Sequence, residues 1–392
     1  MNKNPNTYFW RDSFICTILT ILITGILYFS FIKISALDPF EKAFEDFSLS
    51  DLYTAKDFKE MTPTKDIILI NIKHADRLEI AKTIEIISKQ NPKVIGLDII
   101  FKERKDPQSD SILRSAMTMT KNLVTPFYFD GDQMVTNDNY FLTENQSKGY
   151  INLNFNSGKS VVRDFEGVMS VKDSVYYGFA TQLAIKSGKL KESSARDVLK
   201  DKLLINYTGK TNSFLTFDIE DILANKQIPA LKDAIVIMGY LGTPTNNQYD
   251  VEDKFFTPLN PNYTGKSVPD MYGVVIYANI LKMIITKDFI VKIPNFISYI
   301  LAFLFCFLMT ALGLKIEHKS PFLYHLLIKF LQLLVTVILL YGTLLLLKFN
   351  IHISITPVIV LTVLGIGLIV YYGYLFHYLT KKYKWKNYLS EH

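Results

Sequence analysis

The sequence predicts an α/β protein held in a membrane. We expect one extracytoplasmic domain, in which a mostly parallel sheet carries helices on both faces, and four transmembrane helices, one before the domain and three after it. Two observations predict this arrangement. Long segments without Lys, Arg, Asp or Glu flank a charged middle region, and within that region compact apolar segments alternate with amphipathic ones.

Four segments lack charged residues, with lengths of 20, 22, 18 and 32 residues: 13–32, 293–314, 330–347 and 349–380. A helix crosses a bilayer with about 20 apolar residues, so each segment is a candidate span. The boundaries that we predict divide the chain in this order: N-terminus 1–12, span 13–34, domain 35–292, spans 293–314, 322–347 and 353–378, and tail 379–392.

The formal charge of +6 belongs to the flanks of the spans. Residues 36–291 carry 31 Lys and Arg against 34 Asp and Glu, whereas the rest of the chain carries 12 against 3. The basic residues precede the first span, separate the second from the third, and follow the last. The positive-inside rule therefore predicts that both termini are cytoplasmic and that the middle region is outside.

The same distribution bears on other classes of protein. No basic patch with interleaved aromatic residues occurs in the middle region, so we expect no binding of nucleic acid. Cys16 and Cys306 both fall in predicted spans, which leaves the outer region without a disulfide. The first span competes with a cleaved signal peptide, but 20 uncharged residues exceed the usual apolar core of a signal, which favours a retained anchor.

Within the outer region, the apolar patterns predict alternating elements after an irregular or amphipathic lead-in at 36–65. The predicted strands are 66–72, 93–101, 122–129, 202–207 and 233–240, with a further segment around 214–217. The predicted helices are 77–90, 109–119, 176–188, 192–202, 218–226 and 272–285. Between them, 149–155 and 160–171 alternate and are joined by Asn-Ser-Gly, which predicts a hairpin.

Common catalytic motifs are absent from the sequence. It contains no GxxxxGK[ST], GxGxxG, HExxH, GxSxG or CxxC, and His74 is the one histidine of the outer region. No His, Cys and carboxylate set has the spacing of a metal site. We therefore expect neither an enzyme nor a resident metal or cofactor.

Polar residues instead gather where predicted strands end, the edge at which parallel α/β sheets bind ligands. Asp98 stands inside the apolar run KVIGLDIIF, where a carboxylate is costly to bury without a partner. It either accepts N–H bonds from its own loop or contacts a ligand; a third role, as acid or nucleophile of a hydrolase, lacks companion residues. The candidate ligand-binding residues are Asp98, Arg163, Asn206, Tyr207, Asp253, Thr257, Tyr277 and Asn279.

The order of several motifs resembles the CHASE2 domain, an extracytoplasmic sensor module of bacterial receptors. They are DIILINI, PKVIGLDIIF, DSILRSA, VVRDF, INYTG, AIVIMGYLG, DKFFTPLN and PDMYGVVIYANIL, and the resemblance spans about 66–285. The wording of KDPQSDSIL and of 255–280 is similar to a branch common in Bacteroidetes. The resemblance implies a bacterial inner-membrane protein with a periplasmic domain.

The sequence departs from that family in three places. Ile70-Asn71 stands where an Ile-Asp pair is common, a Pro-Trp-x-Arg stretch is missing, and Tyr277-Ala278 replaces a His-Ala pair. Receptors of this family also continue into a kinase, cyclase or other output domain, whereas about a dozen residues follow the last predicted span here. We therefore expect that any signal passes to a separate protein.

Two hypotheses about function follow. In the first, the domain binds a periplasmic ligand or protein and relays through the transmembrane helices to a separate cytoplasmic or membrane partner, with a homodimer as a possible form. In the second, the protein is a structural or docking subunit of a cell-envelope assembly. Apart from the lipid bilayer, the sequence identifies no partner by name.

Overall fold

The computed structural model describes residues 5–31, 64–153, 161–172, 174–225, 227–243, 251–260 and 268–390. The chain divides into two compact units. The sheet unit comprises Ala43–Ile290, and the helical unit comprises Met1–Lys42 with Val291–His392. Most of the predicted lead-in at 36–65, and the Asn-Ser-Gly turn, lie outside the described residues.

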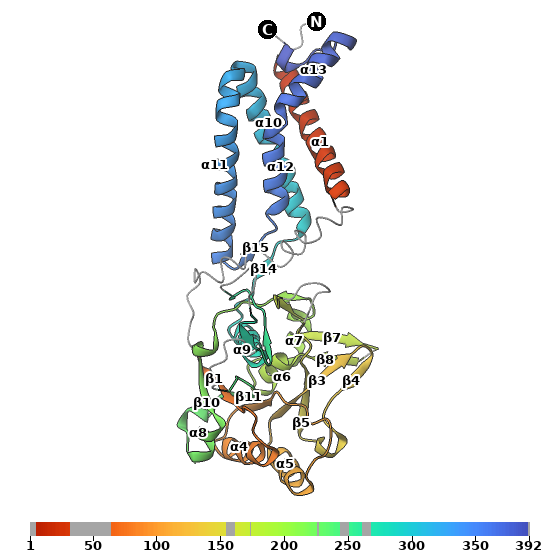
Figure 1. Ribbon diagram of the computed structural model, residues 1–392. Helices are drawn as coiled ribbons and strands as arrows, with labels where there is room; N and C mark the ends of the chain where they lie inside the picture. Colours follow the sequence, from red (N-terminus) through yellow and green to blue (C-terminus); the bar gives the residue numbers. More distant parts are fainter. Residues whose placement is uncertain are drawn as a thin grey trace. The chain divides into compact units, whose positions relative to one another are not determined.

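The sheet unit is built on seven strands in the order β10-β1-β11-β2-β3-β4, with β5 beside β3 (Figure 1). Every pairing in this sheet is parallel except that of β3 with β4. The strands are β1 (Thr64–Asn71), β2 (Val94–Leu97), β3 (Leu123–Asp130), β4 (Gln133–Val135), β5 (Gln146–Tyr150), β10 (Phe214–Asp218) and β11 (Ile235–Gly239). The parallel strands therefore bring their carboxyl ends to one edge.

Helices cover both faces of this sheet, as the continuous apolar strands predict. One face packs against α4 (Arg77–Lys89), α5 (Pro107–Met119) and α8 (Ile219–Ala224), and the other against α6 (Phe179–Lys186) and α9 (Gly273–Thr286). Alternate residues of β1 divide accordingly: Ile68 and Ile70 belong to the first core, Ile67 and Leu69 to the second. Figure 1 shows α4, α5 and α8 together on one side of the strands and α9 with α6 on the other.

Smaller elements complete the sheet unit. They are α7 (Glu192–Val198), the antiparallel pairs β6 (Asp164–Phe165) with β9 (Leu203–Leu204), β7 (Val168–Val171) with β8 (Ser174–Tyr177) and β12 (Lys254–Phe255) with β13 (Met271–Tyr272), and the 3₁₀ turns η2 (Asn139–Phe141), η3 (Thr211–Ser213) and η4 (Pro229–Leu231).

The hairpin predicted between 149–155 and 160–171 is wrong. Gly149 and Tyr150 belong to β5, which pairs in parallel with β3, and the segment 160–171 contributes to pairs with β9 and β8 instead. Gly149 accounts for part of this, since a Cβ there would lie 2.6 Å from Cα of Phe179 at the start of α6. The alternating pattern predicts strands, but the close packing of a helix decides their partners.

The helical unit contains α1 (Pro5–Phe31), α10 (Asn295–Lys319), α11 (Pro321–Lys348), α12 (Thr356–Gly367) and α13 (Ile369–Tyr383), followed by η5 (Tyr388–Ser390). Among the described residues, three helices are long and apolar enough to cross a membrane: α1, α10 and α11. The expected fourth span at 353–378 is instead divided between α12 and α13, which meet at an angle of 50°.

Side chains of α11 account for the bend between α12 and α13. The amide of Gln332 donates to the carbonyl oxygen of Val363 at 2.9 Å, and the hydroxyl of Tyr324 donates to that of Ile366. Bonds of this kind supply partners for carbonyl groups where a helix is interrupted. Gly365 also permits close packing, because a Cβ there would lie 2.8 Å from Sγ of Cys306 on α10. The length of an uncharged segment does not show where the helix within it is interrupted.

A short parallel pair of strands joins the segment just before α10 to the turn between α11 and α12. β14 (Val291–Lys292) pairs with β15 (Ile351–His352). The N–H of Val291 donates to the carbonyl of Asn350, and that of Ile293 to the carbonyl of His352, both at 2.8 Å. The segment that precedes α10 is therefore fixed to a second point of the helical unit.

A buried ion pair fastens α4 to α5 and yields a first prediction. Asp110 is fully buried, pairs with Arg77 and accepts the N–H of Lys105 at 2.8 Å, while Arg77 also donates to the carbonyl of Glu103. Asp110→Ala leaves the guanidinium uncompensated, so we expect a loss of about 3 kcal/mol in the free energy of unfolding. Urea unfolding of the full-length protein, followed by circular dichroism, measures it.

The matched control is Asp132→Ala, because Asp132 is exposed. We expect that variant to stay within about 0.5 kcal/mol of the wild type. Replacing both partners, as in Arg77→Leu with Asp110→Leu, should cost less than Asp110→Ala alone, since no unpaired charge remains. An Asp110→Ala protein as stable as the control would show that the pair is not a fastening point.

Candidate functional site

A cavity of about 260 Å³ opens at the carboxyl end of β2. Three of its walls come from distant parts of the sequence: the residue after β2, the segment that follows β5, and the region where β12 meets the amino end of α9. The lining residues are Asp98, Tyr128, Ile151, Asn152, Leu153, Asp253, Phe255, Gly273 and Tyr277.

Asp98 directly follows β2 and is held by its backbone. Its N–H donates to the carbonyl of Met238 on β11 at 2.8 Å, which continues the ladder one residue beyond the strand. A Cβ on Gly239 would lie 3.2 Å from Cβ of Asp98 and 2.2 Å from Cγ2 of Val274. Gly239 thus lets the end of β11, Asp98 and helix α9 approach one another closely.

Asp253 lies beside the first residue of α9. It has φ of +52°, and its carbonyl accepts the N–H of Gly273 at 3.1 Å. A Cβ on Gly273 would lie about 3.5 Å from both carboxylate oxygens of Asp253. The pairing of β12 with β13 holds this arrangement, since Lys254 is opposite Tyr272. A carboxylate at a helix amino end has a favourable interaction with the helix dipole.

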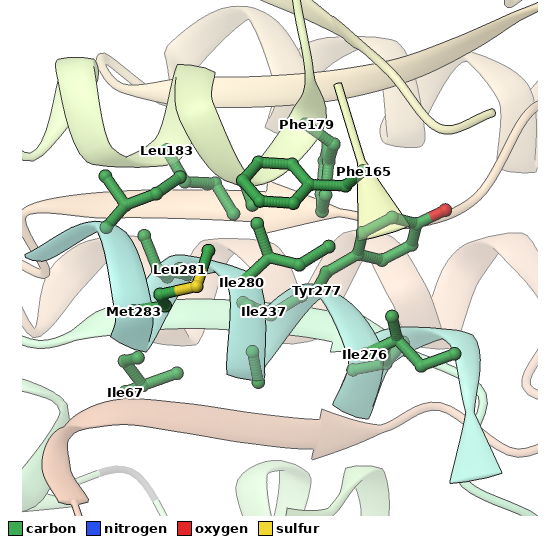
Figure 2. Packing of buried hydrophobic residues seen from close by; sticks show 14 of the residues in the cluster. Ile67, Phe165, Phe179, Leu183, Ile237, Ile276, Tyr277, Ile280, Leu281 and Met283 are labelled. Carbon is green, nitrogen blue, oxygen red and sulfur yellow. The ribbon is translucent and has the colours of Figure 1, made fainter. Parts of the chain in front are cut away.

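Tyr277 lies one helical turn further along α9. Its hydroxyl donates to the carbonyl of Ile151 at 2.7 Å, and its ring packs edge-on against Phe179, 5.5 Å between centroids. Figure 2 shows the ring beside Phe165 and Phe179, with the hydroxyl pointing away from the aliphatic side chains of α9. The helix therefore contributes an apolar face to the core and a hydroxyl to the cavity rim.

The two carboxyl groups of the cavity titrate at unusually high pH. Burial, and secondarily the charge of Asp253, raise the pKa of Asp98 to about 8. Burial, and secondarily Glu252, raise the pKa of Asp253 to about 6. Burial followed by the same two aspartates raises the pKa of Tyr277 well above its usual range. The ionisation of one of these groups therefore affects the pKa of the others.

No described residue donates a hydrogen bond to the Asp98 carboxylate, or forms an ion pair with it. The interpretation of Asp98 as an acceptor of N–H bonds from its own loop is therefore not what the described residues show. The raised pKa agrees with this geometry, because hydrogen bonds to the charged form would have lowered it. Asp98 faces a cavity instead.

Asn206, Tyr207 and Asn279 lie away from the cavity and serve the packing of α9. Asn279 is fully buried; its Oδ1 accepts the N–H groups of Thr208 and Gly209, and its Nδ2 donates to the carbonyl of Gly209. The amide of Asn206 donates to the carbonyl of Asp288 at 2.8 Å, and the hydroxyl of Tyr207 to that of Val162 at 2.9 Å. These side chains fasten the loop at 206–209 to its neighbours.

Thr257 and Arg163 are also outside the cavity lining. The hydroxyl of Thr257 donates to Asp270 at 2.7 Å and its N–H to the same carboxylate at 2.8 Å, which closes the loop between β12 and β13. The carbonyl of Arg163 accepts the N–H of Ile205 at 2.8 Å. Of the eight candidates, the structure therefore brings together Asp98, Asp253 and Tyr277.

Sequence reasoning missed the aromatic walls of the cavity. Tyr128 and Phe255 line it, and Asn152 is fixed beside them by two bonds with the backbone of Phe129. One signal was available for Tyr128, since FYF ends a predicted strand at the edge where ligands bind. Phe255 gave no such signal, because its place depends on the fold of the loop before α9.

Asn71, one of the departures from the CHASE2 pattern, joins the ends of three neighbouring strands, β10, β1 and β11. Its Oδ1 accepts the N–H groups of Lys73 and Leu241, and its Nδ2 donates to the carbonyl of Gly242 and to Asp218. An aspartate at this position could not make the last two bonds when ionised, and it would repel Asp218. The amide therefore suits the neighbours present in this chain.

The pKa of Asp98 generates a second prediction. The group has its ordinary pKa, near 3.8, when unfolded and about 8 when folded, so its contribution to stability is full below pH 3.8 and is lost as the pH rises to 8. Asparagine has no proton to release, so the Asp98→Asn variant does not lose this contribution to stability as the pH rises. We expect the variant to match the wild type near pH 4 and to exceed it by about 2–5 kcal/mol at pH 8.

Thermal unfolding of the full-length protein across this pH range measures the difference. Asp132→Asn, which makes the same change at an exposed site, should show no such pH-dependent gain. A wild type more stable than Asp98→Asn at pH 8 would mean that a cation or donor already stabilises the charged carboxylate.

The sequence was compared with known proteins and domain families. A search of curated proteins finds no match, and a search of solved structures finds none either. The sequence model of the CHASE2 domain matches residues 20–313, which is most of the chain and includes the whole described part of the sheet unit. The protein belongs to the CHASE2 domain family.

Proposed function

We propose that the protein is a membrane-anchored sensor whose outer domain binds a periplasmic ligand or partner and relays the event to a separate protein. One observation carries this proposal: α9 meets the cavity at its first turn and continues towards α10 at its last. Gly273 and Tyr277 line the cavity, α9 ends at Thr286, and α10 begins at Asn295.

The connection between these helices suits a relay. Residues 287–294 separate α9 from α10, and they contain β14 and Pro294, which precedes the first residue of α10. A ligand that favours one position of α9 would bias this short segment, which is the general way in which binding shifts a two-state element. The proposal does not require chemistry in the cavity, and we propose no enzymatic activity.

In this proposal the protein lies in the inner membrane, with both termini in the cytoplasm and the sheet unit in the periplasm. The support is the excess of basic residues beside the predicted spans and the net negative charge of residues 36–291. The bent pair α12 and α13 serves as the fourth span, which gives the even number that places both termini on one side.

The orientation is open to a direct test. Asp132 on the sheet unit and Lys381 near the end of α13 are both exposed, and the native Cys16 and Cys306 are buried. We expect Asp132→Cys to react with an impermeant maleimide on spheroplasts, and Lys381→Cys to react only after the membrane is permeabilised. The opposite pattern would overturn the orientation.

The sensor hypothesis is tested on the full-length protein extracted gently from membranes. We expect a monomer or dimer whose melting temperature rises with a low-molecular-mass extract of the periplasm. The same extract should slow hydrogen exchange in α9 and in residues 287–294, because binding would restrict the helix that lines the cavity. A stoichiometric complex with another envelope protein, unaffected by the extract, would favour the docking-subunit hypothesis instead.

A further inference from the structure

We propose that the cavity at the end of β2 binds a small organic cation, of the amine or guanidinium class. This inference rests on the proposed function and specifies its ligand. Three features of the cavity carry it: the sign of its charged groups, its aromatic walls and its size.

The first feature is charge. Among the described lining residues, Asp98 and Asp253 are the charged ones, and no Lys, Arg or His joins them. Neither carboxylate has an ion-pair partner among the described residues. When both groups are ionised, two carboxylates that line one cavity repel one another, and a cation between them removes that repulsion. An anionic ligand would meet the same repulsion.

The second feature is the aromatic lining. Tyr128, Phe255 and Tyr277 are among the residues that line the cavity. Rings of this kind attract ammonium and guanidinium groups through their electron-rich faces, most strongly where water is excluded. Lys102 illustrates the tendency at one of these residues, since its ammonium group lies 5.3 Å from the ring centre of Tyr128 and 3.0 Å from its hydroxyl.

The third feature is size and donor set. A volume of about 260 Å³ corresponds to roughly eight or nine water molecules, which is room for an organic molecule rather than a bare ion. The described residues contain no group of three or more His, Cys, Asp or Glu suited to a metal ion. Asn152 also lines the cavity, and its amide is held in place there by its two bonds with the backbone of Phe129.

Binding a cation here displaces a proton. In the empty domain at pH 7, the pKa of about 8 leaves Asp98 mostly protonated, and that of about 6 leaves Asp253 mostly ionised. A cation favours the ionised form of both. The affinity should therefore fall about tenfold for each pH unit between 8 and 6, with about one proton released at pH 7.

Other titratable groups surround this pair and belong in the pH analysis. Glu252 precedes Asp253, lies 3.6 Å from His74 and accepts the hydroxyl of Tyr240 at 3.0 Å. Lys102 is beside Tyr128, and Tyr277 stays protonated because its pKa is raised. His74 is the imidazole beside Glu252, so His74→Gln is included as a check that the pH dependence persists without it.

The experiment uses three probes of equal length: putrescine, 1,4-butanediol and succinate, with agmatine and spermidine as further cations. Isothermal titration calorimetry on the full-length protein in nanodiscs measures affinity, and two buffers of different ionisation enthalpy measure proton release. We expect at least one of the cations to bind with release of about one proton at pH 7, and the diol and the dicarboxylate not to bind.

Variants assign the binding to the cavity. Asp98→Asn and Asp253→Asn should each weaken the cation at least tenfold, and Asp98→Asn should also abolish proton release. Asp132→Asn, the exposed control, should change neither. Because Asp98→Asn is expected to be at least as stable as the wild type, weaker binding cannot be ascribed to unfolding.

The inference is overturned if none of the cations binds, if the diol or succinate binds as well as putrescine, or if the two cavity variants bind like the control. These outcomes remain distinct from failure of the proposed function. A periplasmic extract that still raises the melting temperature, while no cation binds, would retain the sensor and reject its cationic ligand. If neither the extract nor any probe has an effect, both proposals fail.

Discussion

The burial of α9 is the constraint on which the sheet unit depends. The first twelve of its 14 residues are buried, so the helix has no face that can turn towards water. Each polar group on it must therefore find a partner inside the protein, or lie at a cavity. Asn279 meets this demand through the loop at 208–209, and Tyr277 through the carbonyl of Ile151.

The same constraint positions the cavity. Gly239 lets α9 lie directly against the end of β11, and Asp253 takes the place beside the amino end of the helix. Asp98 then lies opposite both, at the end of the neighbouring strand. A carboxylate without a partner is costly in such a position, and the proposed cation would offset that cost.

Much of the sheet could be predicted from the sequence, because its strands are apolar on both sides and its helices are amphipathic. β2 and β11 fall within predicted strand segments, and β1 and β3 overlap theirs to within two residues at each end. α4 falls within a predicted helix, and α5 and α9 overlap theirs to within two residues at each end. The pairing of β5 could not be predicted, since alternation specifies a strand without naming its neighbour. In the helical unit, the bend at Leu368 depends on side chains of α11 that lie more than 30 residues away.

The candidate site was predictable only in part, for a related reason. Asp98 stood out because a charge interrupted an apolar run, and Asp253 and Tyr277 followed from their place near strand ends and on the last helix. Asn206, Tyr207, Thr257 and Asn279 shared that polar character, but they bond to groups of the protein: Thr257 to the Asp270 carboxylate and the other three to backbone carbonyls. The sequence shows which side chains can form hydrogen bonds. The fold decides whether such a side chain bonds to another group of the protein or faces a cavity.

The β14–β15 pair connects the segment that follows the sheet unit to two places in the helical unit. Val291 and Ile293 are bonded to Asn350 and His352, so the strand that leads into α10 also holds the start of the segment that leads into α12. One backbone junction therefore connects the segments that lead into α10 and α12. α11 ends at Lys348, just before the same pair of strands, so three helices have an end at this junction. In the proposed relay, a displacement of the junction would reach all three helices at once.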